Sequence, residues 1–163
     1  MRSIVRVLLL IAITITLPLL CSAQADDTAV IDKFIAAQAK KEKGEEPEGV
    51  RKTITGDVNH DGVADTVVLY TIEGQNGSNN YIQYLAVFLR VNGKLTYATH
   101  QAVGGKNHRS VDLGQITDGV INLEFTDYSR NDPSCCPTLK HPGKYVFSAG
   151  VLKEIRPKGG KTT

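Results

Sequence analysis

The strongest indication of the fold comes from residues 81–95, which read YIQYLAVFLRVNGKL. Apolar side chains in its first eleven residues fall on both alternating faces, with Leu85, Val87 and Leu89 on one face and Tyr84, Ala86 and Phe88 on the other. A strand with one face in water alternates between apolar and polar residues, so a strand that is apolar on both faces belongs at the centre of a sheet. We expect residues 81–91 to be a central strand.

Two dipeptides predict tight turns between strands. Asn92-Gly93 ends the central segment, and Asp118-Gly119 separates two further apolar segments. A two-residue hairpin needs positive φ at both central positions, and Asn, Asp and Gly adopt it most easily. Each dipeptide therefore predicts an antiparallel hairpin.

The rest of the chain after residue 50 also has the composition of strands. The segments rich in β-branched and aromatic residues are 64–72, 81–91, 95–103, 110–116, 120–128 and 144–155. Turn residues separate them at short intervals, which is typical of an antiparallel meander. The predicted fold class is α+β, mostly β, with about six to seven strands across residues 50–157.

A single helix is expected before the sheet, within residues 26–49. Its apolar side chains fall on one stripe: Val30, Ile31, Phe34, Ile35 and Ala37. Asp27 or Thr28 would cap it, and it would end near Lys43-Gly44 and cover one face of the sheet. The charged residues 40–48 are expected to form a solvated linker.

The first 25 residues have the features of a secretory signal peptide. Arg2 and Arg6 precede an apolar run at 7–13, and small residues at Ala23 and Ala25 suit cleavage after Ala25. The protein is therefore expected in the periplasm or outside the cell. A retained anchor or a lipid on Cys21 are the alternatives, and membrane attachment is expected only if Cys21 is lipidated. Residues 158–163 are expected to be a disordered tail.

The charge balance argues against nucleic acid as a partner. Two of the 19 basic residues lie in the predicted leader, so the rest of the chain has as many basic as acidic residues. Binding to phosphate backbones needs clustered Lys and Arg that displace counterions. We expect an envelope or extracellular protein as partner instead, and a cell-wall hydrolase is one concrete candidate.

Residues 57–65, DVNHDGVAD, place oxygen donors at alternate positions around Gly62. The donors are the side chains of Asp57, Asn59, Asp61 and Asp65 and the carbonyl of Val63. Hard Ca²⁺ prefers such oxygens, and the pattern resembles the D-x-N-x-D-G-x-x-D loops of integrin-type and dockerin-type calcium modules. An EF-hand loop that begins at Asp57 would need Glu at its twelfth position, which here is Val68. A sensor EF-hand is therefore not expected, and we expect Ca²⁺ to have a structural role. A turn without metal is the alternative.

Cys135 and Cys136 are adjacent and would be the only cysteines left after the leader is removed. An oxidising compartment favours a vicinal disulfide between them, in a loop stiffened by Pro133 and Pro137. Three alternatives stay open: a thiolate metal site with His141, a catalytic cysteine and a reduced buried pair.

The sequence around these cysteines resembles the end of the LppP/LprE-type bacterial lipoproteins. The resemblance is in Asp132-Pro133 and Cys135-Cys136-Pro137, followed by Tyr145-x-Phe147-x-x-Gly150-x-Leu152. It implies a small exported bacterial protein and supplies no catalytic residues.

We therefore expect a non-enzymatic binding protein that presents two polar loops. One spans residues 74–80, with Asn76, Asn79 and Asn80, and the other spans 127–142, with Tyr128 and Arg130. The alternatives are a calcium-dependent hydrolase and a lipid-anchored structural protein of the envelope. The four histidines, His60, His100, His108 and His141, are scattered and lack a G-x-S-x-G or H-E-x-x-H pattern.

Overall fold

The computed structural model describes residues 19–156, so most of the predicted leader and the tail at 158–163 lie outside the described residues. One helix precedes eight strands that pair antiparallel in chain order, which confirms the mostly β meander with a strand count slightly higher than expected. The elements are α1 (Leu19–Glu42), β1 (Lys52–Gly56), β2 (Asp65–Glu73), β3 (Tyr81–Val91), β4 (Lys94–Gly105), β5 (Arg109–Thr117), β6 (Val120–Asp127), β7 (Leu139–Ser148) and β8 (Val151–Glu154).

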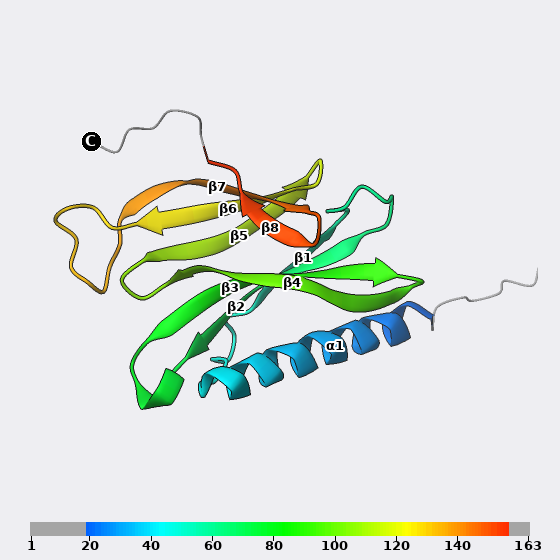
Figure 1. The fold of residues 1–163 in the computed structure, drawn as a ribbon, viewed down its shortest axis with the longest axis horizontal. Helices are drawn as coiled ribbons and strands as arrows, with labels where there is room; N and C mark the ends of the chain where they lie inside the picture. Colours follow the sequence, from blue (N-terminus) through cyan, green and yellow to red (C-terminus); the bar gives the residue numbers. More distant parts are fainter. Residues whose placement is uncertain (1–18, 157–163) are drawn as a thin grey trace, which may run out of the picture.

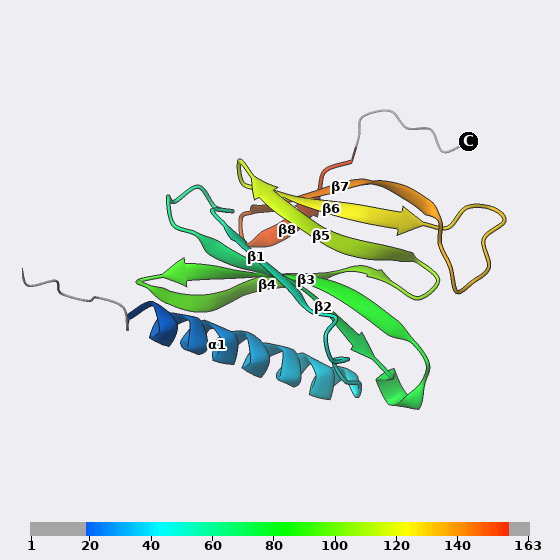
Figure 2. The ribbon, with the colours of Figure 1, turned by 180° about the vertical axis from the view of Figure 1, so that it is seen from behind.

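The sheet folds over between β4 and β5, which share only the ladder pair Gly105 and Arg109. Strands β1–β4 and β5–β8 therefore form two halves that face each other, as Figures 1 and 2 show. At one side β1 approaches β5 so closely that a Cβ on Gly56 would lie 2.8 Å from the Cβ of Ile116. The main core lies between the halves and includes Val67, Leu85, Val87, Ile121, Phe125 and Tyr145.

Helix α1 covers the outer face of the first half (Figure 1). Its buried residues Ile31 and Ile35 pack with side chains of β2 and β3, and these form a second cluster that includes Val68, Tyr70, Ala86 and Phe88. The ring of Phe34 meets that of Phe88 edge-on at 5.4 Å between centroids. Strand β3 is thus buried on both faces, which confirms the prediction that it is central.

Both predicted hairpin turns are confirmed. Asn92 and Gly93 have φ of 50° and 77° between β3 and β4, and Asp118 and Gly119 have φ of 49° and 71° between β5 and β6. These are the left-handed conformations that a two-residue turn of this kind requires.

The C-terminal strand prediction was wrong in two respects. The segment 144–155 is two strands, because Ala149 and Gly150 turn the chain with φ of 53° and 78°. Ala seldom adopts positive φ, so the pair gave no turn signal. Strand β7 also begins at Leu139, so the loop before it spans 128–138, shorter than the expected 127–142. Pro142 is tolerated because β8 pairs with β7 only from Tyr145 onward.

The predicted helix start was also wrong. Helix α1 begins at Leu19, well before Asp27 and Thr28, because residues 19–26 contain neither Pro nor Gly to stop it. In the described part of the chain, no helix has the length and apolar character needed to cross a membrane. The predicted end is confirmed: Lys43 has φ of 54°, and the Gly44 N–H donates to the Ala39 carbonyl at 3.0 Å.

The charged linker is only partly solvated. Glu45 and Glu73 exchange two backbone hydrogen bonds of 2.9 Å, which adds a bridge to the end of β2. Arg51 donates to the carboxylates of Glu46 and Asp32, so the linker is also tied to α1. The connection between helix and sheet is therefore held at both ends.

Candidate functional site

Three connections gather at one end of the sheet, at the left of Figure 1. They are the β2–β3 loop (74–80), the β4–β5 turn (106–108) and the β6–β7 loop (128–138). Alternate connections of a meander return to the same end, which explains why segments far apart in sequence meet there. Lys106 joins two of them, since its Nζ lies 2.6 Å from Asn79 Oδ1 and its N–H donates to the Tyr81 carbonyl.

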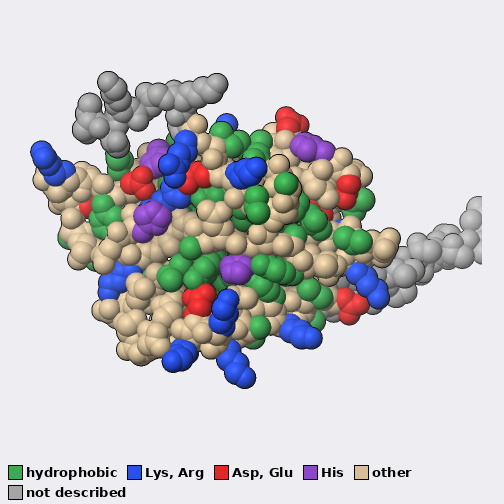
Figure 3. All heavy atoms as spheres, viewed as in Figure 1, with side chains coloured by type: hydrophobic (Ala, Val, Ile, Leu, Met, Phe, Trp, Pro, Cys, Tyr) green, Lys and Arg blue, Asp and Glu red, His purple; other side chains and the backbone are tan. Residues whose placement is uncertain are grey.

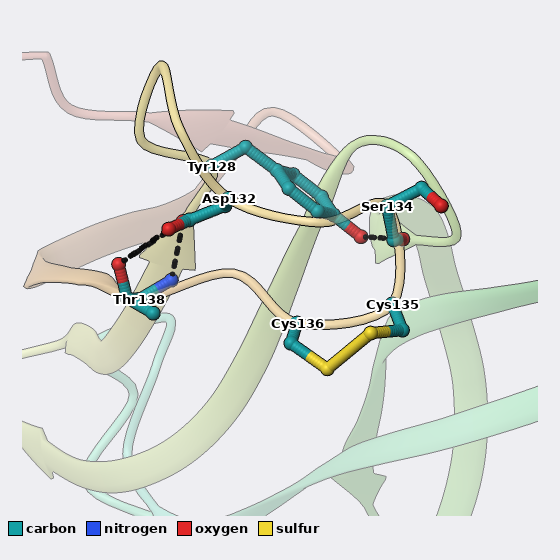
Figure 4. The surroundings of a disulfide bond; sticks show 6 residues. All are labelled: Tyr128, Asp132, Ser134, Cys135, Cys136 and Thr138. Carbon is teal, nitrogen blue, oxygen red and sulfur yellow. Dashed lines mark hydrogen bonds between the residues drawn. A yellow bond between two sulfur atoms is a disulfide. The ribbon is translucent and has the colours of Figure 1, made fainter.

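The β6–β7 loop is braced by its own hydrogen bonds (Figure 4). The carboxylate of Asp132 accepts from the Ser129 N–H at 2.7 Å and from the N–H and hydroxyl of Thr138, both at 2.9 Å. The hydrogen bond from Ser129 is the largest cause of the lowered pKa of Asp132. Across the loop, the Tyr128 hydroxyl donates to the Ser134 carbonyl at 2.7 Å.

Cys135 and Cys136 form the predicted vicinal disulfide in this loop. Both residues are exposed, and the Cys136 N–H donates to the Pro133 carbonyl at 3.0 Å. A thiolate metal site, a catalytic cysteine and a reduced buried pair all need free thiols, which this bond removes. The disulfide therefore adds a third constraint to the shape of the loop.

A hollow of about 590 Å³ opens between the β4–β5 turn and the β6–β7 loop. Its walls include Asn107, His108, Arg109, Asp127, Tyr128 and Asp132. Figure 3 shows histidine side chains beside acidic and basic ones at this end of the molecule. Burial is the main cause of the raised pKa of Tyr81, and the neighbouring Tyr128 raises it further. The hollow is thus polar, with aromatic rings close to it.

Arg109 ties this end to the rest of the sheet. Its Nη2 lies 3.1 Å from Glu154 Oε2, its Nε donates to the Val103 carbonyl at 2.7 Å, and its guanidinium carbon lies 3.7 Å from the ring centroid of Phe125. Arg109 was not among the residues predicted for the site. An Arg at the start of a strand normally extends into solvent, and its partner Glu154 is 45 positions away.

Three residues of the hollow, Asp127, Asn107 and His108, have hydrogen-bonding groups that the fold does not use. His141 Nε2 lies 2.7 Å from Asp127 Oδ2, and among residues 19–156 no hydrogen bond reaches Asp127 Oδ1. Within the described residues, the side chains of Asn107 and His108 form no hydrogen bond. These three groups are therefore free to bind a ligand.

The structure brings most of the predicted ligand-binding residues to this end. Tyr128 lines the large hollow, while Asn79 and Asn80 line a smaller one of about 290 Å³ beside it. Asn76 lies in the same β2–β3 loop with φ of 54°, and Arg130 is exposed in the β6–β7 loop.

The predicted calcium loop lies at the opposite end, between β1 and β2 (Figure 1). Asp57 accepts from the N–H groups of Asp61 and Gly62 at 3.2 and 2.9 Å, and Asp61 accepts from the Val63 N–H at 2.8 Å. The bond from Gly62 is the largest cause of the lowered pKa of Asp57. Asn59 accepts from the Asp61 N–H at 3.1 Å, so the loop is a series of Asx turns.

Asp65 has a different environment from the other predicted calcium ligands. It is fully buried, with Oδ2 accepting from the Val58 N–H at 3.2 Å and Oδ1 from the Arg90 N–H at 2.9 Å. Among residues 19–156, no three Asp, Glu, His or Cys side chains converge in a way that could hold a metal. Asp65 therefore serves as an internal cap for two backbone donors.

No family model matches the chain, and neither a curated protein nor a solved structure matches it. The resemblances to LppP/LprE-type lipoproteins and to calcium modules therefore stay predictions.

Proposed function

We propose that this chain is an exported binding protein without catalytic activity, and that its loop end binds a component of the cell envelope. The gathering of three connections at one end of the sheet, two of which line a hollow, is the observation that supports this proposal. The β6–β7 loop is braced by Asp132, by Tyr128 and by the disulfide. A loop that is already rigid loses little conformational entropy when it binds, so it suits recognition.

The arrangement of the histidines favours binding over hydrolysis. His100 packs against the ring of Phe34 at 5.4 Å, and burial is the main cause of its lowered pKa. The two histidines near the hollow, His108 and His141, form no hydrogen bond with a Ser, Thr or Cys side chain of the described residues. A hydrolase of the nucleophilic type needs such a nucleophile beside its base.

The proposal predicts that loop variants lose the envelope ligand while the fold stays intact. Immobilised protein is incubated with solubilised envelope extract and, separately, with purified cell walls. Cys135→Ser with Cys136→Ser, combined with Arg130→Ala, should reduce the retained material at least tenfold. The thermal midpoint should change little, because a bond between neighbouring residues removes little chain entropy.

The matched control is Lys94→Ala with Asp118→Asn, which changes exposed residues at the opposite end. This variant should retain as much envelope material as the wild type. Equal retention by all three proteins would contradict the proposal. An intact mass that shows acyl chains on Cys21 would instead favour the lipid-anchored structural protein.

Calcium binding at the opposite end is part of the proposal, with a structural role. Asp57, Asn59 and Asp61 would supply side-chain oxygens and Val63 its carbonyl. We expect a Kd of about 10⁻⁴ to 10⁻³ M, as in extracellular modules, and a stabilisation of about 1.4 kcal/mol at ten times Kd. Calorimetry with and without Ca²⁺ measures the rise in Tm, and Asp61→Ala should abolish it. Identical melting curves of the wild type with and without Ca²⁺ would contradict the proposed calcium site.

A further inference from the structure

We propose that the ligand of the loop-end hollow is a sugar ring of an envelope glycan, held by Asn107, His108 and Asp127 and stacked against Tyr128. This inference rests on the proposed function and names the ligand class for the same end of the molecule. Three properties of the hollow support it: its charge, its free hydrogen-bonding groups and its shape.

The charge of the hollow disfavours phosphate and carboxylate ligands. The guanidinium of Arg109 is paired with Glu154, and the ammonium of Lys106 is engaged with Asn79. Asp127 and Asp132 both line the hollow, and Arg109 is the one basic residue among the lining residues named above. An anionic ligand would therefore meet two acidic residues beside a guanidinium that Glu154 already pairs.

The free groups match a ligand rich in hydroxyls. The amide of Asn107 and the imidazole of His108 each provide a donor and an acceptor, and Asp127 Oδ1 is a free acceptor. A hydroxyl both donates and accepts, so neighbouring hydroxyls on one ring can pair with this mixture. A purely apolar ligand would bury these groups without partners, which is unfavourable.

The shape and rigidity of the hollow suit a small ring. Its volume of about 590 Å³ lies in the ordinary range of small-molecule sites. Figure 4 shows the Tyr128 side chain held across the loop by the hydrogen bond from its hydroxyl to the Ser134 carbonyl. An aromatic ring fixed in this way offers an apolar surface to the C–H face of a sugar.

The test titrates the purified protein with N-acetylated chitotriose and follows backbone amide shifts by NMR. The expected result is a saturable shift confined to residues 106–109 and 127–134. Tyr128→Leu and Asp127→Ala should each raise Kd at least tenfold, and Asp118→Asn at the opposite end should leave it unchanged. Tyr128→Phe keeps the ring but loses the hydroxyl bond to Ser134, so its Kd should lie between those of the wild type and Tyr128→Leu.

Inorganic phosphate and purified peptidoglycan are the comparison probes. Phosphate should shift none of these amides, while peptidoglycan should deplete the wild type from solution and spare Tyr128→Leu. Shifts with phosphate, or no shifts with chitotriose and no depletion by peptidoglycan, would overturn the sugar assignment. If envelope capture still depended on the loop variants, only the ligand class would fail. If the loop variants also captured as much envelope material as the wild type, the proposed function would fail too.

Discussion

Replacing Asp65 with Ala is expected to lower the free energy of unfolding by about 3–5 kcal/mol. The carboxylate is fully buried and accepts from the N–H groups of Val58 and Arg90. Its removal leaves a buried donor on Val58 and a partly buried one on Arg90 unpaired, and each unpaired buried donor costs about 1–3 kcal/mol. Asp65→Asn keeps one acceptor and should cost roughly half as much. Urea denaturation followed by circular dichroism measures the loss.

Asp57→Ala is the matched control, because Asp57 caps N–H groups in the same loop through solvent-exposed hydrogen bonds. It should lower the free energy of unfolding much less than Asp65→Ala, since water can replace an exposed cap. The loss of unfolding free energy in Asp65→Ala should be the same in EDTA and in Ca²⁺, because it arises from unpaired N–H groups inside the protein and not from metal binding. A loss that appears only with Ca²⁺ would make Asp65 a metal ligand and contradict its role as an internal cap.

Replacing Arg109 with Met is expected to lower the free energy of unfolding by about 2–4 kcal/mol. Glu154 would then stay largely buried without its partner, and the contacts to Val103 and Phe125 would change. Burial raises the pKa of Glu154, but the hydrogen bonds and charge of Arg109 outweigh it, so the pKa lies below its ordinary value of 4.5. The ion pair therefore stabilises the fold above pH 4.5, and this contribution disappears as pH falls through the lowered pKa.

Two comparisons make the Arg109 prediction specific. Arg109→Met combined with Glu154→Leu should recover part of the stability, because no buried charge is left alone. Lys140→Met breaks a pair with Glu124 whose side chains are 67% and 51% exposed, and it should change the free energy of unfolding little. Urea titrations at pH 7 and pH 3.5 measure all four proteins. An equal loss for Arg109 and Lys140 would contradict the buried role of Arg109.

The parts of the fold that sequence could predict are those encoded locally. The two apolar faces of β3 and the Asn92-Gly93 turn need no knowledge of distant residues. Strand β1 was missed because it has five residues and is largely exposed, so it lacks the apolar alternation of the others. The Ala149-Gly150 turn was missed because its conformation is imposed by the pairing of β7 with β8.

The candidate site was predictable only in part for a related reason. Tyr128 and the asparagines were identified from the polar character of their loops, and the disulfide from adjacency. The hollow depends on which connections share an end of the meander, and that is a property of the whole sheet. Asp65 could not be separated from the exposed acidic residues of its motif, because its burial is decided by contact with Arg90 on the neighbouring strand β3.

The single ladder pair between β4 and β5 has a consequence for the order of folding. Every strand pairs with its predecessor in the chain, so a nascent polypeptide can add one hairpin at a time. Once β4 has emerged, α1 and β2–β4 already contain the whole of the cluster around Ile35 and Phe88. The opposite face, with Leu85 and Val87, then waits uncovered for β5–β8. A chain that has folded only through β4 would therefore expose this apolar face, and that is the surface that a chaperone would have to shield.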